Sequence, residues 1–418
     1  MVKVAFSKVL INDLWREPSG WEYHGYHDDV EARCVYFDGS DGKLLFIALD
    51  IIILSRKRDR ILGEEAAKRL NLSPEEVLVH CTQAHNAVPY TEVYLDCVAE
   101  RVAEAMQPAI TKAQEAEMTF ACADVDGQFS VNRRKYVSDD LGVCTFWDGY
   151  RKEGTRAYAE HLVAALRKSL LSPRPSNIYW IGPQNLPVSG GLSKVDGLAP
   201  ICYDRPVDSL VHLLVFRTLE GKPLGSLLRF STHVQTAVVP LQRDKVYTAD
   251  FPHYTRNRLE EALGGVAVFA SGPAGNIVPL QEEWTWKEME RYGNALADAA
   301  LAEFHENPPR FAPLTHLKVL SREVNLPVRA DMPASVEEAK GKAALIREEL
   351  NTAVALGAPL RQIKRMADLL NHYEWSPNKL TSTSWHYLDP EEVRRRKVNI
   401  RITGVRLNNV LILGMPGE

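Results

Sequence analysis

The segment from Tyr247 to Pro279 reads YTADFPHYTRNRLEEALGGVAVFASGPAGNIVP. It joins a polar turn, a helical stretch that begins at Pro252, a Gly-Gly break and a short apolar run from Val266 to Ala270. A β-branched and aromatic run of this length, bounded by glycines, is typical of a buried strand. The glycine-rich loop that follows lies beyond the carboxyl end of this strand, where open α/β sheets bind their ligands. The segment therefore predicts an α/β fold with a site at the strand ends.

The same alternation extends from Met1 to about Glu282 and predicts an α/β fold, a layered mixed β-sheet core flanked by helices. The predicted strands lie at Cys34–Phe37, Leu44–Leu54, Val77–His80, Met118–Ala123, Ile178–Ile181, Leu210–Phe216, Leu224–Ser231 and Val266–Ala270. The predicted helices lie at Lys57–Leu70, Val93–Ala109, Arg156–Leu170 and Pro252–Leu263.

From Trp284 the pattern changes. A helical period runs through Trp284–Asn307, Ser335–Leu356 and Leu360–Tyr373, and strand patterns return at Val398–Val405 and Val410–Leu413. We interpret residues 284–397 as a largely helical insertion within a single domain that spans residues 1–418.

Composition excludes several function classes. The 418 residues carry a net charge of −4, whereas a nucleic-acid partner demands a basic face. The N-terminal MVKVAFSKVL lacks the pattern of a signal peptide, and the longest apolar run, Leu44–Leu54, is interrupted by Asp50 and too short to span a bilayer. The six cysteines show no CxxC spacing, which favours reduced thiols. We expect a cytoplasmic protein with a small-molecule substrate, no nucleic-acid partner and no stable membrane anchor.

Six phrases of the sequence match known motifs. Thr248–Glu260 is similar to "SADYPGYTRRRLE", and Gly265–Pro279 is similar to "GVALFLQGACGDINP". The other four are Val77–Asn86 ("ATHTHSG"), Val131–Arg134 ("INRR"), Leu228–His233 ("NFACHPT") and Gly414–Glu418 ("GLPGE"). No phrase is specific alone, but together and in this order they resemble the neutral/alkaline ceramidase family in its short, catalytic-domain-only form. The resemblance implies a fold like the ceramidase catalytic domain.

The resemblance also implies a zinc site. Three of the family's zinc ligands fall on Gln83, His233 and Glu418, and the fourth, a tyrosine, lies beyond the last residue of this sequence. An amide oxygen is a weak substitute for imidazole. His233 and Glu418 are therefore the candidate metal ligands, with zinc as a possible cofactor.

The catalytic serine of the family falls on Val278, in Gly275-Asn-Ile-Val-Pro279. Valine cannot attack a carbonyl or transfer a proton. We therefore do not expect hydrolysis of ceramide itself.

A set of polar residues remains for chemistry. His85 and His233 each follow a predicted apolar strand, so both are candidates for general acid or base. Arg133 resembles the family's substrate-positioning arginine, and its guanidinium suits a carboxylate or a polarised carbonyl. Asp250 is either catalytic or the N-cap of the next helix. Candidate substrate-binding residues are Gln83, Asn132, Gln235 and Asn276.

Three hypotheses stay open. The first is a hydrolase that acts on a small polar N-acyl or sugar-type substrate. The second is a metal-independent carbohydrate-active enzyme of the glycoside hydrolase type, which would use Asp50, Asp250 and Glu418 and a tryptophan-rich insertion. The third is a non-catalytic ligand-binding protein. For Asp50 itself, inside an apolar run, the simplest role is a structural hydrogen bond to the loop that carries His85.

Overall fold

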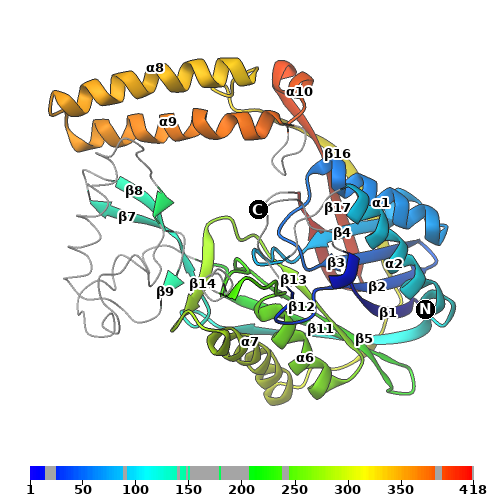
Figure 1. The fold of residues 1–418 in the computed structure, drawn as a ribbon. Helices are drawn as coiled ribbons and strands as arrows, with labels where there is room; N and C mark the ends of the chain where they lie inside the picture. Colours follow the sequence, from blue (N-terminus) through cyan, green and yellow to red (C-terminus); the bar gives the residue numbers. More distant parts are fainter. Residues whose placement is uncertain are drawn as a thin grey trace.

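The computed structural model describes residues 1–14, 25–87, 92–138, 142–146, 149–150, 178–179, 207–237, 244–381 and 388–416. Within these ranges the predicted fold class is confirmed, because a large mixed sheet is flanked by helices (Figure 1). The predicted helix at Arg156–Leu170 lies outside the described residues.

The largest sheet has the strand order β13-β12-β11-β5-β1-β2-β3-β4, with β15 paired to β5. Its β3–β4 and β12–β13 pairs are parallel and its other pairs antiparallel. The strands are β1 Lys3–Leu10, β2 Glu31–Gly39, β3 Gly42–Leu49, β4 Val77–Cys81, β5 Gln114–Asp124, β11 Leu210–Thr218, β12 Pro223–Phe230, β13 Val266–Ser271 and β15 Ala312–Pro313.

Both faces of this sheet are apolar, and alternate residues of each strand enter different cores. In β2, Cys34 and Tyr36 pack with helices α1 (Arg56–Leu70) and α2 (Glu92–Thr111), whereas Val35 packs on the opposite face with residues of β11 and β13. Side chains of β11–β13 on their other face pack with α6 and α7. Helix α6 spans Phe251–Leu263 and α7 spans Trp286–Glu306. The sheet thus folds over on itself, which gives four layers: helices, strands, strands, helices.

This folding brings the two end strands of the sheet together. The backbone N–H of Ser271, at the end of β13, donates to Nε2 of His80 in β4 across 2.9 Å. The Ser271 hydroxyl donates to the carbonyl of Thr82 across 2.6 Å. The carboxyl ends of β4, β12 and β13 therefore meet at one place, which positions the candidate site.

The described strands and helices mostly match the predicted ones, with two informative differences. The strand predicted at Leu44–Leu54 ends at Leu49, because the chain turns at Asp50. The Asp50 side chain accepts from the Glu31 N–H across 2.9 Å, and the Ile51 N–H bonds back to the Leu49 carbonyl across 2.9 Å. Strands β1 and β16 (Leu317–Pro327) were not predicted.

Smaller sheets and helices complete the structure. β6 (Ser130–Asn132), β14 (Ile277–Gln281) and β9 (Gly149–Tyr150) form one three-stranded sheet. β7 (Arg134–Ser138), β8 (Gly142–Phe146) and β10 (Ile178–Tyr179) form another. Two 3-10 turns, Asn12–Leu14 and Pro74–Glu76, precede longer elements.

The range 284–397 contains three kinds of structure. α7 covers the main sheet, and β16 pairs with β17 (Lys397–Leu407), which pairs with β18 (Val410–Gly414). The helical part of the range is the hairpin of α8 (Val336–Ala355) and α9 (Leu360–Leu380), followed by α10 (Pro390–Arg395). The hairpin extends away from the main sheet (Figure 1).

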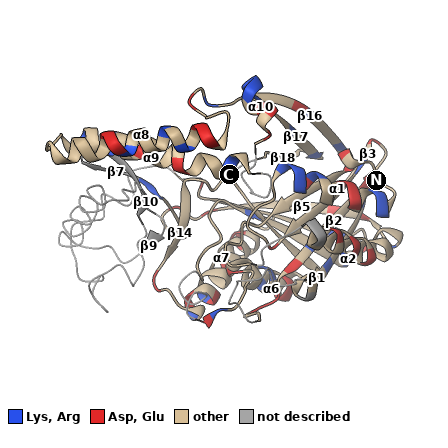
Figure 2. Ribbon diagram, turned by 45° about the horizontal axis from the view of Figure 1, so that its top comes forward, with Lys and Arg blue, Asp and Glu red and all other residues tan. Residues whose placement is uncertain are grey.

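Basic and acidic residues are interspersed along the outer helices, as in α8 (Figure 2). The basic run at the start of α1 includes Arg56, whose guanidinium donates to Glu392 of α10 across 2.7 Å. Arg394 pairs with Glu391 within α10. These two arginines of the basic runs thus lie on helix faces and pair with acidic side chains.

The contact between α6 and α7 depends on Gly293. A Cβ at this position would lie 2.4 Å from the carbonyl oxygen of Phe251 and 2.8 Å from the Cβ of Tyr254. We expect Gly293→Ala to lower the free energy of unfolding by about 1–3 kcal/mol, the usual range for overpacking. Gly341→Ala in α8 is the matched control, since nothing lies within 4 Å of its Cβ. It should raise stability by about 0.5–1 kcal/mol. Urea denaturation measures both, and equal effects of the two variants would contradict the close contact.

Candidate functional site

The loops that follow β4 and β12 meet and bring His85 and His233 together. Ala84 and Val234 form a parallel bridge, and the backbone N–H of His85 donates to the Val234 carbonyl across 3.0 Å. The two imidazole rings lie with their centroids 5.3 Å apart. Two histidines separated by 148 positions in the sequence therefore share one place, as the prediction of a common site requires.

His233 is held in a fixed orientation. Its side chain is buried, and its Nδ1 lies 2.6 Å from the carbonyl oxygen of Ile277 in β14. A carbonyl accepts hydrogen bonds and cannot donate them, so Nδ1 carries the proton. Nε2 is then the basic nitrogen of His233, which suits it to accept a proton or to bind a metal ion.

His85 is neutral at physiological pH. Burial lowers the pKa of its imidazole well below the ordinary value, and the nearby positive charges of His233, when protonated, and Arg133 lower it further. A neutral imidazole has one basic nitrogen and one N–H donor. The pair therefore offers a base and a hydrogen-bond donor at neutral pH.

Arg133 joins this site from the position directly after strand β6. Its backbone N–H donates to the Asn276 carbonyl across 2.8 Å. Its Nε and Nη2 both donate to the Gly275 carbonyl, at 3.1 and 2.7 Å. The guanidinium is thereby fixed on the glycine-rich loop, close enough to His85 to affect the pKa of that histidine.

The other predicted substrate-binding residues line the same loops. Asn132 and Gln235 are buried and Asn276 is half-buried. The Asn132 side-chain oxygen accepts from the Arg134 backbone N–H across 2.9 Å. Contact of these residues with a substrate stays a prediction.

Val278 is a packing residue. It is fully buried and forms an apolar cluster with Val131 and Leu280. A hydroxyl at this position would need a hydrogen-bond partner among apolar side chains. The environment of Val278 therefore matches its side chain and offers no nucleophile.

Asp250 ties the two histidine loops to α6. Its fully buried carboxylate accepts from Asn86 Nδ2 at 2.8 Å, from the backbone N–H groups of Thr236 and Ala237 at 3.1 and 2.9 Å, and from the Thr236 hydroxyl. It also caps α6 by accepting from the Phe251 N–H at 2.8 Å. Its backbone has φ 62° and ψ −161°, a conformation that residues other than glycine rarely adopt. Asp250 is thus the N-cap of α6. It also joins the two histidine loops through hydrogen bonds that the sequence did not reveal.

Asp50 and Arg256 form a buried ion pair directly beneath the loop of His85. Arg256 donates from Nη1 and Nη2 to the two Asp50 oxygens at 2.7 and 2.8 Å, and both side chains are fully buried. Burial alone would lower the pKa of Arg256, but the Asp50 carboxylate raises it above its ordinary value. Thr82 donates its hydroxyl to Asp50 across 3.3 Å, so the predicted hydrogen bond between Asp50 and the histidine loop is confirmed.

Sequence reasoning missed Arg256, Thr236 and Asn86, which hold the loops in place. In the sequence, Arg256 is one polar residue of an amphipathic helix. The one hint of its role is Asp50, an acidic residue within an apolar run that needs a partner when buried. Thr236 and Asn86 each follow a histidine by one to three residues, and that position alone does not predict a shared aspartate.

The fit of a zinc ion can be judged from the side chains at hand. Of the three implied ligands, His233 presents a basic Nε2, Gln83 an amide oxygen, and Glu418 lies outside the described residues. Within the described ranges no group of three or more His, Cys, Asp and Glu side chains is placed to hold a metal. One imidazole and one amide are fewer and weaker donors than zinc sites use. Zinc therefore stays a proposal, and no chemical step is assigned to it.

His80, the other histidine of this region, has a structural role. Its Nε2 accepts the hydrogen bond from Ser271, and burial lowers its pKa to about 4. The unfolded chain binds the proton first as the pH falls below about 6.5. His80 therefore stabilises the fold above that pH, and this contribution is lost as the pH falls towards 4.

We expect this loss to reach up to about 3 kcal/mol, at 1.36 kcal/mol per pKa unit. Asp28 acts in the opposite direction, because burial raises its pKa to about 7, so its contribution is lost as the pH rises. Comparison with His80→Asn, which cannot titrate, isolates the histidine. Urea denaturation at pH 4.5 and 6.5 should show a smaller pH dependence in the variant, and an unchanged dependence would contradict the assignment.

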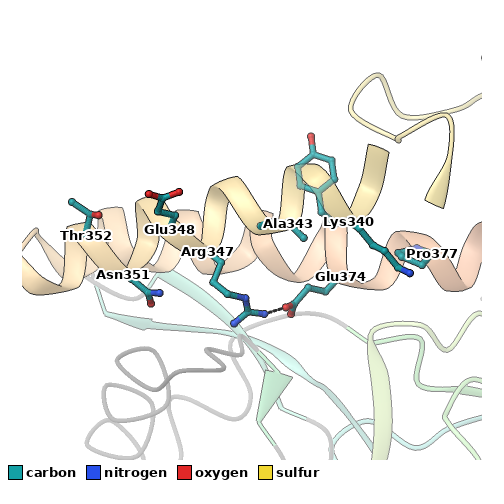
Figure 3. Close-up of a pocket in the computed structure, with 10 residues that line it drawn as sticks. Lys340, Ala343, Arg347, Glu348, Asn351, Thr352, Glu374 and Pro377 are labelled. Carbon is teal, nitrogen blue, oxygen red and sulfur yellow. Dashed lines mark hydrogen bonds and ion pairs between the residues drawn. The ribbon is translucent and has the colours of Figure 1, made fainter. Parts of the chain in front are cut away.

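A separate groove of about 740 Å³ lies on the hairpin of α8 and α9 (Figure 3). Arg347 of α8 and Glu374 of α9 point towards each other across it and form an ion pair. The other charged residues along it are Lys340 and Glu348, so its charges balance. It contains neither of the paired histidines, and the candidate site stays at the strand ends.

Comparisons with known proteins show the fold. No family model and no curated protein matches the chain. Among solved structures, the neutral ceramidase from Pseudomonas aeruginosa matches with a TM-score of 0.57 and 14% identity over 99% of this chain. A ceramidase complexed with C2 matches with a TM-score of 0.56 and 14% identity, also over 99% of this chain. The chain spans 62% and 63% of the length of those two chains. From these two matches, the chain has a ceramidase-like fold.

No described helix is both long and apolar enough to cross a bilayer.

Proposed function

We propose that this protein is a hydrolase that cleaves a small polar N-acyl compound at the paired histidines. The observation that carries this proposal is the 5.3 Å approach of His85 and His233, with the orientation of His233 fixed by Ile277. The likeness to ceramidases, whose name denotes cleavage of an N-acyl lipid, supports the reaction class. Val278 in place of a nucleophile argues against ceramide as the substrate.

The roles follow from the chemistry of each group. His233 Nε2 accepts a proton from a water molecule as the oxygen of that water attacks the acyl carbonyl. The Arg133 guanidinium stabilises the negative charge that develops on the carbonyl oxygen. The C–N bond then breaks as protonated His233 passes its proton to the leaving amine, with the neutral His85 imidazole beside it as the hydrogen-bond donor of the pair. The products are a carboxylate and a free amine.

The carbohydrate alternative has less support from the described carboxylates. Both oxygens of Asp50 are bonded to Arg256, and both oxygens of Asp250 accept backbone and side-chain donors. A glycosidase needs carboxyl groups that can exchange protons with the substrate. Among the tryptophans of the insertion that would shape a sugar site, Trp284 is buried and Trp375 is exposed. The ring of Trp286 stacks on that of His27, with the two ring centroids 3.9 Å apart.

The test is the release of primary amine from short N-acyl compounds, with fluorescamine as the reagent. The panel contains N-acylethanolamines, N-acetylhexosamines and N-acyl amino acids, and a parallel panel of nitrophenyl glycosides tests the sugar alternative. We expect turnover in the first panel alone. Turnover confined to the glycosides would favour the carbohydrate enzyme, and stoichiometric binding without any turnover would favour the non-catalytic descendant.

A further inference from the structure

Gln83 carries a buried polar atom that no described residue meets with a hydrogen bond. Its side chain is 6% exposed, and its Oε1 receives no hydrogen bond from the described residues. A buried carbonyl oxygen of this kind has lost its hydration without replacement, which makes the position costly for the fold. Such an atom is best explained by a donor that arrives with a ligand or with water.

The backbone of Gln83 adds a second and independent cost. Its φ is 67°, in the left-handed region where glycine or asparagine is usual. A strained backbone at a residue that also holds an unpaired buried oxygen points to function rather than to stability.

The position of Gln83 places it beside the paired histidines. It precedes the Ala84–Val234 bridge by one residue, so its backbone runs alongside His233. Thr232, the residue before His233 on the other loop, is also fully buried and its hydroxyl also has no described partner. Two residues whose side-chain oxygens have no partner among the described residues thus adjoin the paired histidines along the chain.

We infer that Gln83 determines specificity by accepting a hydrogen bond from the N–H of a secondary amide, so that the site selects N-acyl amines over the corresponding esters. The inference rests on the proposed function and names its substrate class. A site built to pair with an N–H rejects an analogue that lacks it, because the buried oxygen is then left unpaired. An ester presents an oxygen where the amide presents the N–H, with almost the same shape.

The probes are N-acetylglucosamine and its 2-O-acetyl ester analogue, which differ in this one group. Binding is measured by titration calorimetry, and turnover by acetate release, for wild type, Gln83→Met and Gln83→Glu. Methionine keeps the length of the side chain and removes the acceptor, whereas glutamate keeps an acceptor oxygen. We expect wild type to bind the amide about 10- to 100-fold more tightly than the ester, the usual effect of one buried hydrogen bond. Gln83→Met should lose this preference through weaker amide binding, and Gln83→Glu should keep part of it.

The outcomes separate this inference from the proposed function. Selective amide binding without acetate release would support the role of Gln83 and count against the hydrolase. Hydrolysis with equal affinity for amide and ester, or with a preference that Gln83→Met leaves intact, would overturn the inference alone. Failure of wild type to bind the amide would overturn it as well. Melting temperatures of the variants serve as the folding control, and a variant that does not fold is replaced by Gln83→Leu.

Discussion

Asp50→Asn is expected to destabilise the protein by about 3–5 kcal/mol, the usual cost of removing one partner from a buried ion pair. The substitution keeps the volume of the side chain and removes its charge, so the fully buried Arg256 guanidinium loses its counter-charge. The second nearby carboxylate, Glu31, lies 3.8 Å from Arg256 and is already bonded to Arg33 at 2.7 Å. Urea denaturation at pH 7 measures the loss.

Asp298→Asn is the matched control, because Asp298 of α7 pairs across 2.8 Å on the surface with Arg258 of α6, the helix that also carries Arg256. An exposed pair of this kind contributes about 0–1 kcal/mol. If the two variants lost the same stability, the ion pair beneath the histidine loop would not have the structural role described here. A smaller loss in Asp50→Asn combined with Arg256→Met than in Asp50→Asn alone would confirm that the unpaired charge is the cause.

His233→Asn is expected to lower kcat by about 10²- to 10⁴-fold on the substrate found by amine release, the usual contribution of general acid–base catalysis. Asparagine can still donate to the Ile277 carbonyl, so the loop should keep its position. The variant therefore removes the basic nitrogen with little effect on the fold. Initial rates at saturating substrate and the melting temperature are measured together.

His316→Asn controls for the loss of a histidine in general. His316 is exposed, and its Nδ1 contacts the hydroxyl of the neighbouring Thr315 across 2.8 Å. We expect wild-type rates from this variant. Unchanged kcat in His233→Asn would place the chemistry elsewhere in the molecule.

The fold was largely predictable from the sequence because its signals are local. The run Val266-Ala-Val-Phe-Ala between glycines is strand β13, and the FPHYTRNRLEEAL period is helix α6 with Asp250 as its N-cap. The sequence did not reveal that the sheet folds over on itself. That arrangement depends on which face of each strand meets which layer, and an apolar run such as Leu44–Leu49 is the same on both faces.

The two histidines of the candidate site could be predicted from the sequence, whereas the residues that hold their loops in place could not. His85 and His233 each follow a strand, and parallel neighbours end at the same edge of a sheet. The tie through Asp250 and the ion pair of Asp50 with Arg256 join segments that are far apart in the sequence. Long-range hydrogen bonds of this kind have no local signal. The unpaired oxygen of Gln83 likewise exists only in the folded chain.

His85 and His233 are proposed to act together as one catalytic unit, and a double-mutant cycle is the most direct test of this proposal. Amine release is measured for wild type, His85→Asn, His233→Asn and the variant with both changes. Groups that act as a unit show strongly non-additive losses. The double variant is expected to be about as slow as the slower single variant. Losses that multiply, or rates that neither change affects, would contradict it.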